Sequence, residues 1–179
     1  MDEFFVDDIL QPKMKKKVNA VQKGKRVERA LAKVLTEKFG DTGFSRTIGS
    51  GNRWAHVASL PQHAQDTFTG DLVCPENFAF TVESKGGYEA EIDLNSILFN
   101  GNARFNGFLE QAEHESNQSG RKPLILWKRS RKPWLSIIKT EDLPHLDWEY
   151  RLLYKDWSMI PLDSLLTLPN EFFYEEKSS

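Results

Sequence analysis

The sequence predicts an α/β fold in which a central mixed β-sheet of about five strands is flanked by helices. Two stretches with helical spacing of apolar residues, 24–39 and 103–118, alternate with short strand-like segments bounded by glycine and proline. Helices interspersed with short strands are typical of a sheet that is covered by helices. The 179 residues, of which 39% are hydrophobic and 12% aromatic, suffice for one domain with a buried core.

The first helix is expected over residues 24–39, and Gly40 is expected to end it. Its apolar side chains recur every three or four residues: Val27, Leu31, Val34, Leu35 and Phe39. Glu28 interrupts this face, because at about 100° per residue it lies within the apolar arc. A carboxylate there needs a partner, which a backbone amide, an arginine or a metal-bound water would provide.

Three strands are expected next. Residues 44–48 form the first candidate, and a flexible turn over 49–52 follows it. Residues 69–74 and 78–85 are the second and third strands. Because only three residues connect them, they are expected to form a hairpin.

The second half of the chain is expected to contain a further helix followed by two strands. A helix is expected over 103–118, with Gly120 ending it and one apolar stripe: Phe105, Phe108, Leu109 and Ala112. Two strands, 124–127 and 134–138, are joined by a basic turn. A short helix is expected after Pro161.

The chain divides into three expected parts. Residues 1–22 form a basic N-terminal arm, which we expect to be mobile because its lysines follow no period. Residues 23–140 form the domain that carries the candidate site. Residues 141–179 are an acidic, aromatic-rich C-terminal extension, expected to pack on the domain or to lie at a dimer interface.

The net charge of −2 hides two basic runs. The first spans residues 13–29 and contains Lys13, Lys15, Lys16, Lys17, Lys23, Lys25, Arg26 and Arg29. The second contains Arg121, Lys122, Lys128, Arg129, Arg131 and Lys132. Two local basic patches on a nearly neutral chain indicate a surface for a polyanion such as nucleic acid, with an ordinary solvated face as the alternative.

The sequence also bears on the compartment. No apolar run approaches the roughly 20 residues that a membrane-spanning helix needs, so we expect no membrane association. The lone cysteine, Cys74, lies in a strand-like segment, where a buried apolar role is expected. One cysteine forms no internal disulfide, which fits an intracellular location such as the cytoplasm or nucleoid, or the host cytoplasm for a viral protein.

The candidate site lies on the second and third expected strands. Asp71 follows a glycine, and Glu83 comes twelve residues after Asp71. Glu83 and Lys85 point to the same face of a strand, since side chains alternate along it. Two carboxylates can hold a hard divalent cation, and a lysine beside it can orient water. These are the minimal parts of a metal-dependent phosphodiesterase. Glu-x-Lys alone is common on strands, so the combination carries the argument.

Other chemistries are less well supported. His56 and His63 have no cysteine partners and lie in an expected loop, which disfavours a zinc site. The small residues 49–51 lack the Gly-Lys-Ser/Thr end of a P-loop.

The order of these features resembles the PD-(D/E)XK nuclease superfamily, and within it the archaeal-type Holliday junction resolvases, which include relatives in bacterial viruses. The likeness spans residues 20–140 and rests on Glu28, the 49–51 turn, Gly70-Asp71, Glu83-Ser84-Lys85 and a helical glutamine, Gln111. It implies a restriction-endonuclease-like core.

The resemblance implies a role for each matching residue. Asp71 and Glu83 would bind Mg²⁺, for which Mn²⁺ would substitute, together with the backbone carbonyl of Ser84. Lys85 would position or polarise the attacking water, with general-base catalysis as a secondary role. Glu28 would bind the metal directly or through water.

Further positions match outside the metal site. Ser50 would approach the scissile phosphate, Arg46 matches a basic position ahead of the 49–51 turn, and Gln111 would support the site. The family usually has proline before the aspartate, where this chain has Gly70.

We therefore expect a Mg²⁺-dependent endodeoxyribonuclease that cleaves four-way DNA junctions as a homodimer. Contacts to DNA are expected from Lys15, Lys16, Lys17, Lys23, Lys25, Arg26, Arg29, Arg46, Arg53, Lys128, Arg129 and Arg131. One alternative is a nuclease of the same fold that acts on duplex or single-stranded DNA in recombination, repair or restriction. Others are a non-catalytic DNA-binding module and an interaction protein whose basic arm binds an acidic partner.

Overall fold

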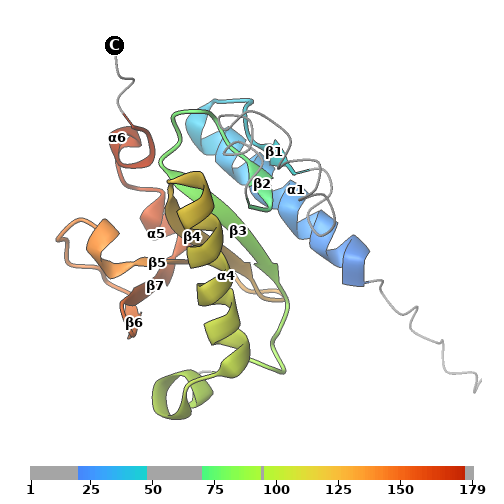
Figure 1. Ribbon diagram of the computed structural model, residues 1–179, viewed down its shortest axis with the longest axis vertical. Helices are drawn as coiled ribbons and strands as arrows, with labels where there is room; N and C mark the ends of the chain where they lie inside the picture. The colour runs from blue at the N-terminus through green and yellow to red at the C-terminus, as the bar shows by residue number, and fades with distance from the viewer. Residues whose placement is uncertain (1–19, 48–69, 94, 176–179) are drawn as a thin grey trace, which may run out of the picture.

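The computed structural model describes residues 20–47, 70–93 and 95–175. Figure 1 shows the arrangement of the elements. In chain order they are α1 (Ala20–Phe39), β1 (Ser45–Arg46), β2 (Leu72–Val73), β3 (Phe80–Gly86), the π-helical η1 (Ser96–Asn100), α4 (Ala103–Ser119), β4 (Lys122–Lys128), β5 (Trp134–Lys139), the 3-10 turn η2 (Thr140–Asp142), β6 (Leu152–Tyr154), β7 (Trp157–Pro161), α5 (Leu162–Leu165) and α6 (Asn170–Phe173).

The centre of the fold is a five-stranded mixed sheet in the order β3-β4-β5-β7-β6. β3 and β4 are parallel, and α4 makes the crossover between them, as a parallel pair requires. The remaining neighbours are antiparallel. The predicted α/β class, with a mixed sheet of about five strands flanked by helices, is confirmed and fits a restriction-endonuclease-like fold.

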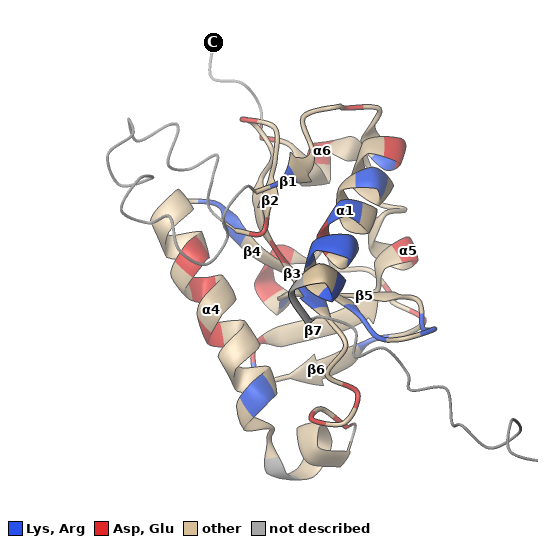
Figure 2. Cartoon of the chain, turned by 90° about the vertical axis from the view of Figure 1, so that its right-hand side faces the viewer, with Lys and Arg blue, Asp and Glu red and all other residues tan. Residues whose placement is uncertain are grey.

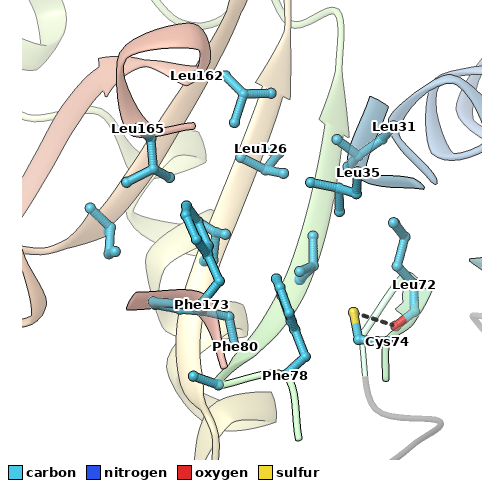
Figure 3. Close-up of a cluster of buried hydrophobic side chains, with 14 of the residues drawn as sticks. Leu31, Leu35, Leu72, Cys74, Phe78, Phe80, Leu126, Leu162, Leu165 and Phe173 are labelled. Atoms are coloured by element: carbon cyan, nitrogen blue, oxygen red, sulfur yellow. Dashed lines mark hydrogen bonds between the residues drawn. The ribbon is translucent and has the colours of Figure 1, made fainter. Parts of the chain in front are cut away.

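Helices cover both faces of the sheet, as Figure 2 shows, with α4 on one side and α1 and α5 on the other. Two apolar clusters fill the spaces between these layers. One contains residues of α1, β3, β4 and α5, among them Leu31, Leu35, Phe80, Leu126 and Leu165 (Figure 3). The other lies under α4 and contains Phe105, Phe108, Ile125, Ile137 and Trp157. Of the helices described, none is long and apolar enough to cross a membrane.

Both long helices end at the predicted glycine, whereas α1 begins at Ala20, four residues before the predicted start. Gly40 has a φ of +65° and its N–H donates to the carbonyl of Thr36, closing α1. α4 begins after Asn102, whose side chain accepts a hydrogen bond from the N–H of Phe105. It ends at Gly120, with a φ of +70°. Local chemistry therefore determines where both helices stop and where α4 starts.

The predicted hairpin of residues 69–74 with 78–85 is wrong. β2 pairs with β1 in a separate two-stranded sheet, and β3 pairs along its length with β4. β2 reaches β3 through one main-chain bond, from the N–H of Asp71 to the carbonyl of Val82. The connection turns at Pro75, whose carbonyl accepts from the N–H of Phe78, and the ring of Phe78 is buried in the core (Figure 3). This anchoring separates β2 from the β3 ladder.

The segment after residue 140, expected as an extension, supplies the other two strands of the sheet. β7 pairs with β5, and β6 pairs with β7. α5 follows Pro161 at the predicted place, and Leu162 and Leu165 are buried. Phe173 of α6 reaches the same cluster as Phe78 (Figure 3). The buried position predicted for Cys74 is confirmed.

Candidate active site

The free edge of β3 holds Asp71. The N–H of Asp71 donates to the carbonyl of Val82 over 3.1 Å, and its Oδ2 accepts from the N–H of Ser84 over 3.0 Å. The N–H and carbonyl of one strand residue point to the same side, so the Ser84 carbonyl also lies at this edge. The carboxylate and the carbonyl that the family resemblance assigns to one metal site therefore border the same strand edge.

Gly70 makes this approach possible. Its φ is +87°, a conformation that L side chains rarely adopt, and a Cβ atom there would lie 2.8 Å from the carbonyl oxygen of Val82. The nuclease superfamily usually has proline at this position. Because proline fixes φ near −65°, it could not adopt the backbone conformation of Gly70. The departure from the family pattern thus follows from the local backbone of this chain.

Replacing Gly70 by alanine should destabilise the fold by about 1–3 kcal/mol, because strain at positive φ adds to the clash with Val82. Gly107→Ala is the matched control. Gly107 lies within α4, and a Cβ atom added there would meet nothing within 4 Å beyond its own helix backbone. Alanine at this position should therefore raise stability by about 0.5–1 kcal/mol. Urea denaturation measures both. Equal effects of the two substitutions would contradict this account of Gly70.

Glu83, Lys85 and Gln111 form a hydrogen-bonded triangle between β3 and α4. Lys85 Nζ lies 2.8 Å from Glu83 Oε2 and 2.7 Å from Gln111 Oε1. Gln111 Nε2 donates to the same Glu83 oxygen over 2.9 Å. Glu83 is 1% exposed and Lys85 8% exposed. The structure therefore brings together the predicted carboxylate, lysine and supporting glutamine.

The packing of α4 on the sheet positions Gln111. Phe108 is buried one turn earlier on the helix, and its ring centroid lies 5.2 Å from Lys85 Nζ. Glu115, one turn later, accepts a hydrogen bond from Gln111 Nε2 at its Oε1 over 2.9 Å. The Oε2 atom of Glu115 is buried and has no hydrogen-bond partner among the described residues. Glu115 was not among the predicted site residues, although its spacing of four from Gln111 indicates that the two side chains are neighbours on the helix.

Asp71, Glu83 and Lys85, which lie at this strand edge, all have raised pKa values. Burial, and next the charge of Glu83, raise the pKa of Asp71 to about 7. Burial, and next the neighbouring Glu115 carboxyl group, raise the pKa of Glu83 to about 8. Burial alone would lower the pKa of Lys85, but the carboxylates of Glu83, Asp71 and Glu115 outweigh it and the pKa is raised. A protonated Lys85 suits water orientation and charge stabilisation better than general-base catalysis.

The donor set fits a hard divalent cation. Carboxylate and carbonyl oxygens are the ligands that Mg²⁺ prefers. Burial, and next the neighbouring acids, disfavour the ionised forms of Asp71 and Glu83, and a bound cation would stabilise those ionised forms. In the described parts of the chain, no three Asp, Glu, His or Cys side chains are grouped closely enough to bind a metal by themselves. Mg²⁺ is commonly held by one or two carboxylates together with water and phosphate oxygens, so two carboxylates are sufficient.

Glu28 has the arginine partner that was one of its three expected options. Its Oε2 contacts the Nε of Arg46, which joins α1 to β1, and both side chains are largely buried. The charge of Glu28 also contributes to the raised pKa of Asp71. The structure thus places Glu28 near the candidate site while its carboxylate binds Arg46.

The described part of the first basic run lies near the part of the second run that follows β4. Lys23 Nζ would lie 3.0 Å from a Cβ atom at Gly87. The N–H of Ser130 and, more weakly, the charges of Lys23 and Arg129 lower the pKa of Glu89. The start of α1 therefore lies beside the β4–β5 turn, as the blue segments in Figure 2 show. We call this the basic end; it comprises Lys23, Lys25, Arg26, Arg29, Lys128, Arg129 and Arg131.

Some predicted positions lie elsewhere. Arg121 and Lys122 lie at the opposite end of β4, where Arg121 donates to main-chain carbonyls and Lys122 pairs with Asp142. Ser50 and Arg53 fall outside the described residues, as do Lys15, Lys16 and Lys17.

Comparison with known proteins identifies a family. The family model described as "Phage putative PDDEXK endonuclease" matches residues 19–159. No curated protein and no solved structure matches the chain. The matched range covers most of the 179 residues, from the start of α1 into β7, and contains every described residue of the candidate site. The chain therefore belongs to the phage PDDEXK endonuclease family.

Proposed function

We propose that this protein is a metal-dependent, structure-selective DNA endonuclease that cuts four-way junctions by paired phosphodiester hydrolysis. The observation that carries the proposal is the meeting of Asp71, Glu83, Lys85 and Gln111 at the free edge of β3. Membership of an endonuclease family supports the nuclease reaction. The choice of a four-way junction as substrate follows from the resemblance to resolvases.

Each residue of the candidate site is proposed to have a separate role in phosphodiester hydrolysis. Asp71, Glu83 and the Ser84 carbonyl would hold Mg²⁺, or Mn²⁺ in its place, which supplies Lewis-acid polarisation of the phosphate and a lower pKa for water. Lys85 orients the attacking water and offsets the negative charge that develops on the phosphate. Gln111 fixes the Lys85 ammonium against Glu83. The resemblance to resolvases implies that the 3′ oxygen is the leaving group, which would give 5′-phosphate and 3′-hydroxyl ends.

Substrate class is decided by direct comparison. Purified protein would be incubated with a labelled four-way junction, a matched linear duplex and a single strand, each with Mg²⁺ and with EDTA. Symmetric nicks on the junction alone, lost in EDTA, are the expected result. Metal-dependent cutting of duplex or single strand would replace the substrate but keep the reaction. Tight junction binding without cutting would favour a non-catalytic DNA-binding module.

The basic end, together with Arg46, is proposed to hold DNA phosphates without reading sequence. Arg131 is exposed on the β4–β5 turn. Arg131→Ala should weaken binding of all sequences alike and lower the slope of log affinity against log salt by about 1. Lys155→Ala is the control, since Lys155 is exposed on the β6–β7 turn, beside Asp156 that binds Lys139 at the other end of β5. A slope that is unchanged in Arg131→Ala would contradict a phosphate contact there.

A homodimer is proposed because a four-way junction presents two symmetric cleavage points, which a two-fold pair of sites would match. Exposed apolar side chains in the C-terminal segment support this region as the interface, namely Leu146, Tyr150 and Leu153. Leu153 lies on β6, an outer strand of the sheet. Leu153→Arg should therefore yield monomers by light scattering, and a persisting dimer would place the interface elsewhere.

A further inference from the structure

The side-chain amide of Gln111 has one possible orientation in its network. A lysine ammonium only donates hydrogen bonds, so the atom 2.7 Å from Lys85 Nζ must be the acceptor Oε1. Nε2 then faces two carboxylates, and both of its hydrogens have acceptors, Glu83 Oε2 and Glu115 Oε1, each at 2.9 Å. The amide is therefore held at three points.

One of these three points lies on the same helix as Gln111. Glu115 follows Gln111 by four residues on α4, the spacing at which helical side chains are neighbours. Gln111 as a whole is exposed, so without Glu115 its amide would exchange its contacts with water and rotate among several rotamers. The hydrogen bond from Gln111 Nε2 to Glu115 Oε1 is the contact of the amide that lies outside the Lys85–Glu83 ion pair.

The position of the Glu115 carboxyl group is unfavourable for the stability of the fold. Its Oε2 accepts no N–H or hydroxyl hydrogen from the described residues, and the group lies against the carboxyl group of Glu83, whose pKa it raises through a side-chain hydrogen bond and through its charge. Two carboxylates in contact repel each other unless they share a proton. The α4 surface offers a matched comparison in Glu110, which is exposed. An acid is thus held beside the carboxylates of the site although the fold gains little from it.

We infer that Glu115 is a positioning residue of the candidate active site, which orients the amide of Gln111 so that it links Lys85 to Glu83. The inference rests on the proposed hydrolytic function for its consequence in catalysis. Its geometric content, that Glu115 fixes the Gln111 amide, can be tested without any activity.

The kinetic test uses a double-mutant cycle of Gln111→Ala and Glu115→Ala. Each single variant should lower kcat by about 10- to 100-fold with KM for DNA unchanged, the usual range for a residue that orients a ligand of the site. The double variant should be no slower than Gln111→Ala, because both remove the same arrangement. Glu115→Gln should restore most of kcat, since its amide oxygen can still accept from Gln111 Nε2, and Glu110→Gln should leave kcat unchanged. Additive losses, or no rescue by Glu115→Gln, would overturn the inference.

The second measurement is the side-chain amide signal of Gln111 in ¹⁵N–¹H NMR spectra of the metal-free protein, assigned by its loss in Gln111→Ala. Two well-separated, slowly exchanging hydrogens are expected in the parent protein and in Glu115→Gln. In Glu115→Ala the signals should move to the values of a free glutamine. An unchanged signal in Glu115→Ala would overturn the inference. If the parent protein cuts no DNA, the proposed function fails, while this spectrum still decides what Glu115 does.

Discussion

Replacing Glu83 by glutamine should abolish DNA cleavage while the protein stays folded. One carboxylate oxygen, Oε2, accepts from both Lys85 and Gln111, and the amide oxygen of glutamine can accept both bonds in its place. The substitution therefore keeps the local contacts and removes the negative charge. Because that charge would hold the divalent cation, the loss in kcat should be at least about 100- to 1,000-fold.

Three measurements separate this prediction from simple unfolding. The near-ultraviolet circular dichroism spectrum of Glu83→Gln should match that of the parent protein, and junction binding in EDTA should be unchanged. Calorimetric titration with Mg²⁺ should lose its binding signal. Glu110→Gln makes the same chemical change on an exposed part of α4 and should retain full activity. If Glu83→Gln kept more than a tenth of the parent activity, Glu83 would not be a metal ligand.

The sequence was sufficient where local chemistry decides the structure. Gly40 and Gly120 end the two long helices because each adopts a positive φ that other residues avoid. The alternation of side chains placed Glu83 and Lys85 on one face of β3, and burial of the helix stripe that includes Phe108 turned Gln111 toward them. These relations involve residues close in the chain, or faces fixed by periodicity.

The sequence failed where pairing between distant segments decides the structure. The parallel pairing of β3 with β4, rather than with β2, depends on the crossover through α4, which no local pattern reveals. β6 and β7 are three and five residues long, too short for a clear alternation. Among the acids of α4, Glu110, Glu113 and Glu115 look alike in the sequence. Only the docked helix shows that Glu115 contacts Gln111.

The metal-free protein should lose stability as the pH rises from about 5 to 8. The folded state raises the pKa of Asp71 from its ordinary 3.8 to about 7, and that of Glu83 from 4.5 to about 8. Between these limits the folded protein binds more protons than the unfolded chain, so its free energy of unfolding falls with rising pH. For Asp71 alone the change between the two limits is at most about 4 kcal/mol.

A divalent cation should reverse this dependence, because it binds the ionised carboxylates and competes with protons for them. Urea denaturation at a series of pH values, in EDTA and in excess Mg²⁺, gives the two curves. Asp71→Asn, whose amide oxygen can still accept from the N–H of Ser84, should flatten the EDTA curve and reduce the gain from Mg²⁺. A stability that is independent of pH in EDTA would mean that the carboxylates of Asp71 and Glu83 are already compensated by the protein. The ionised carboxylates would then need no cation for their stabilisation, and this result would count against a metal-dependent nuclease.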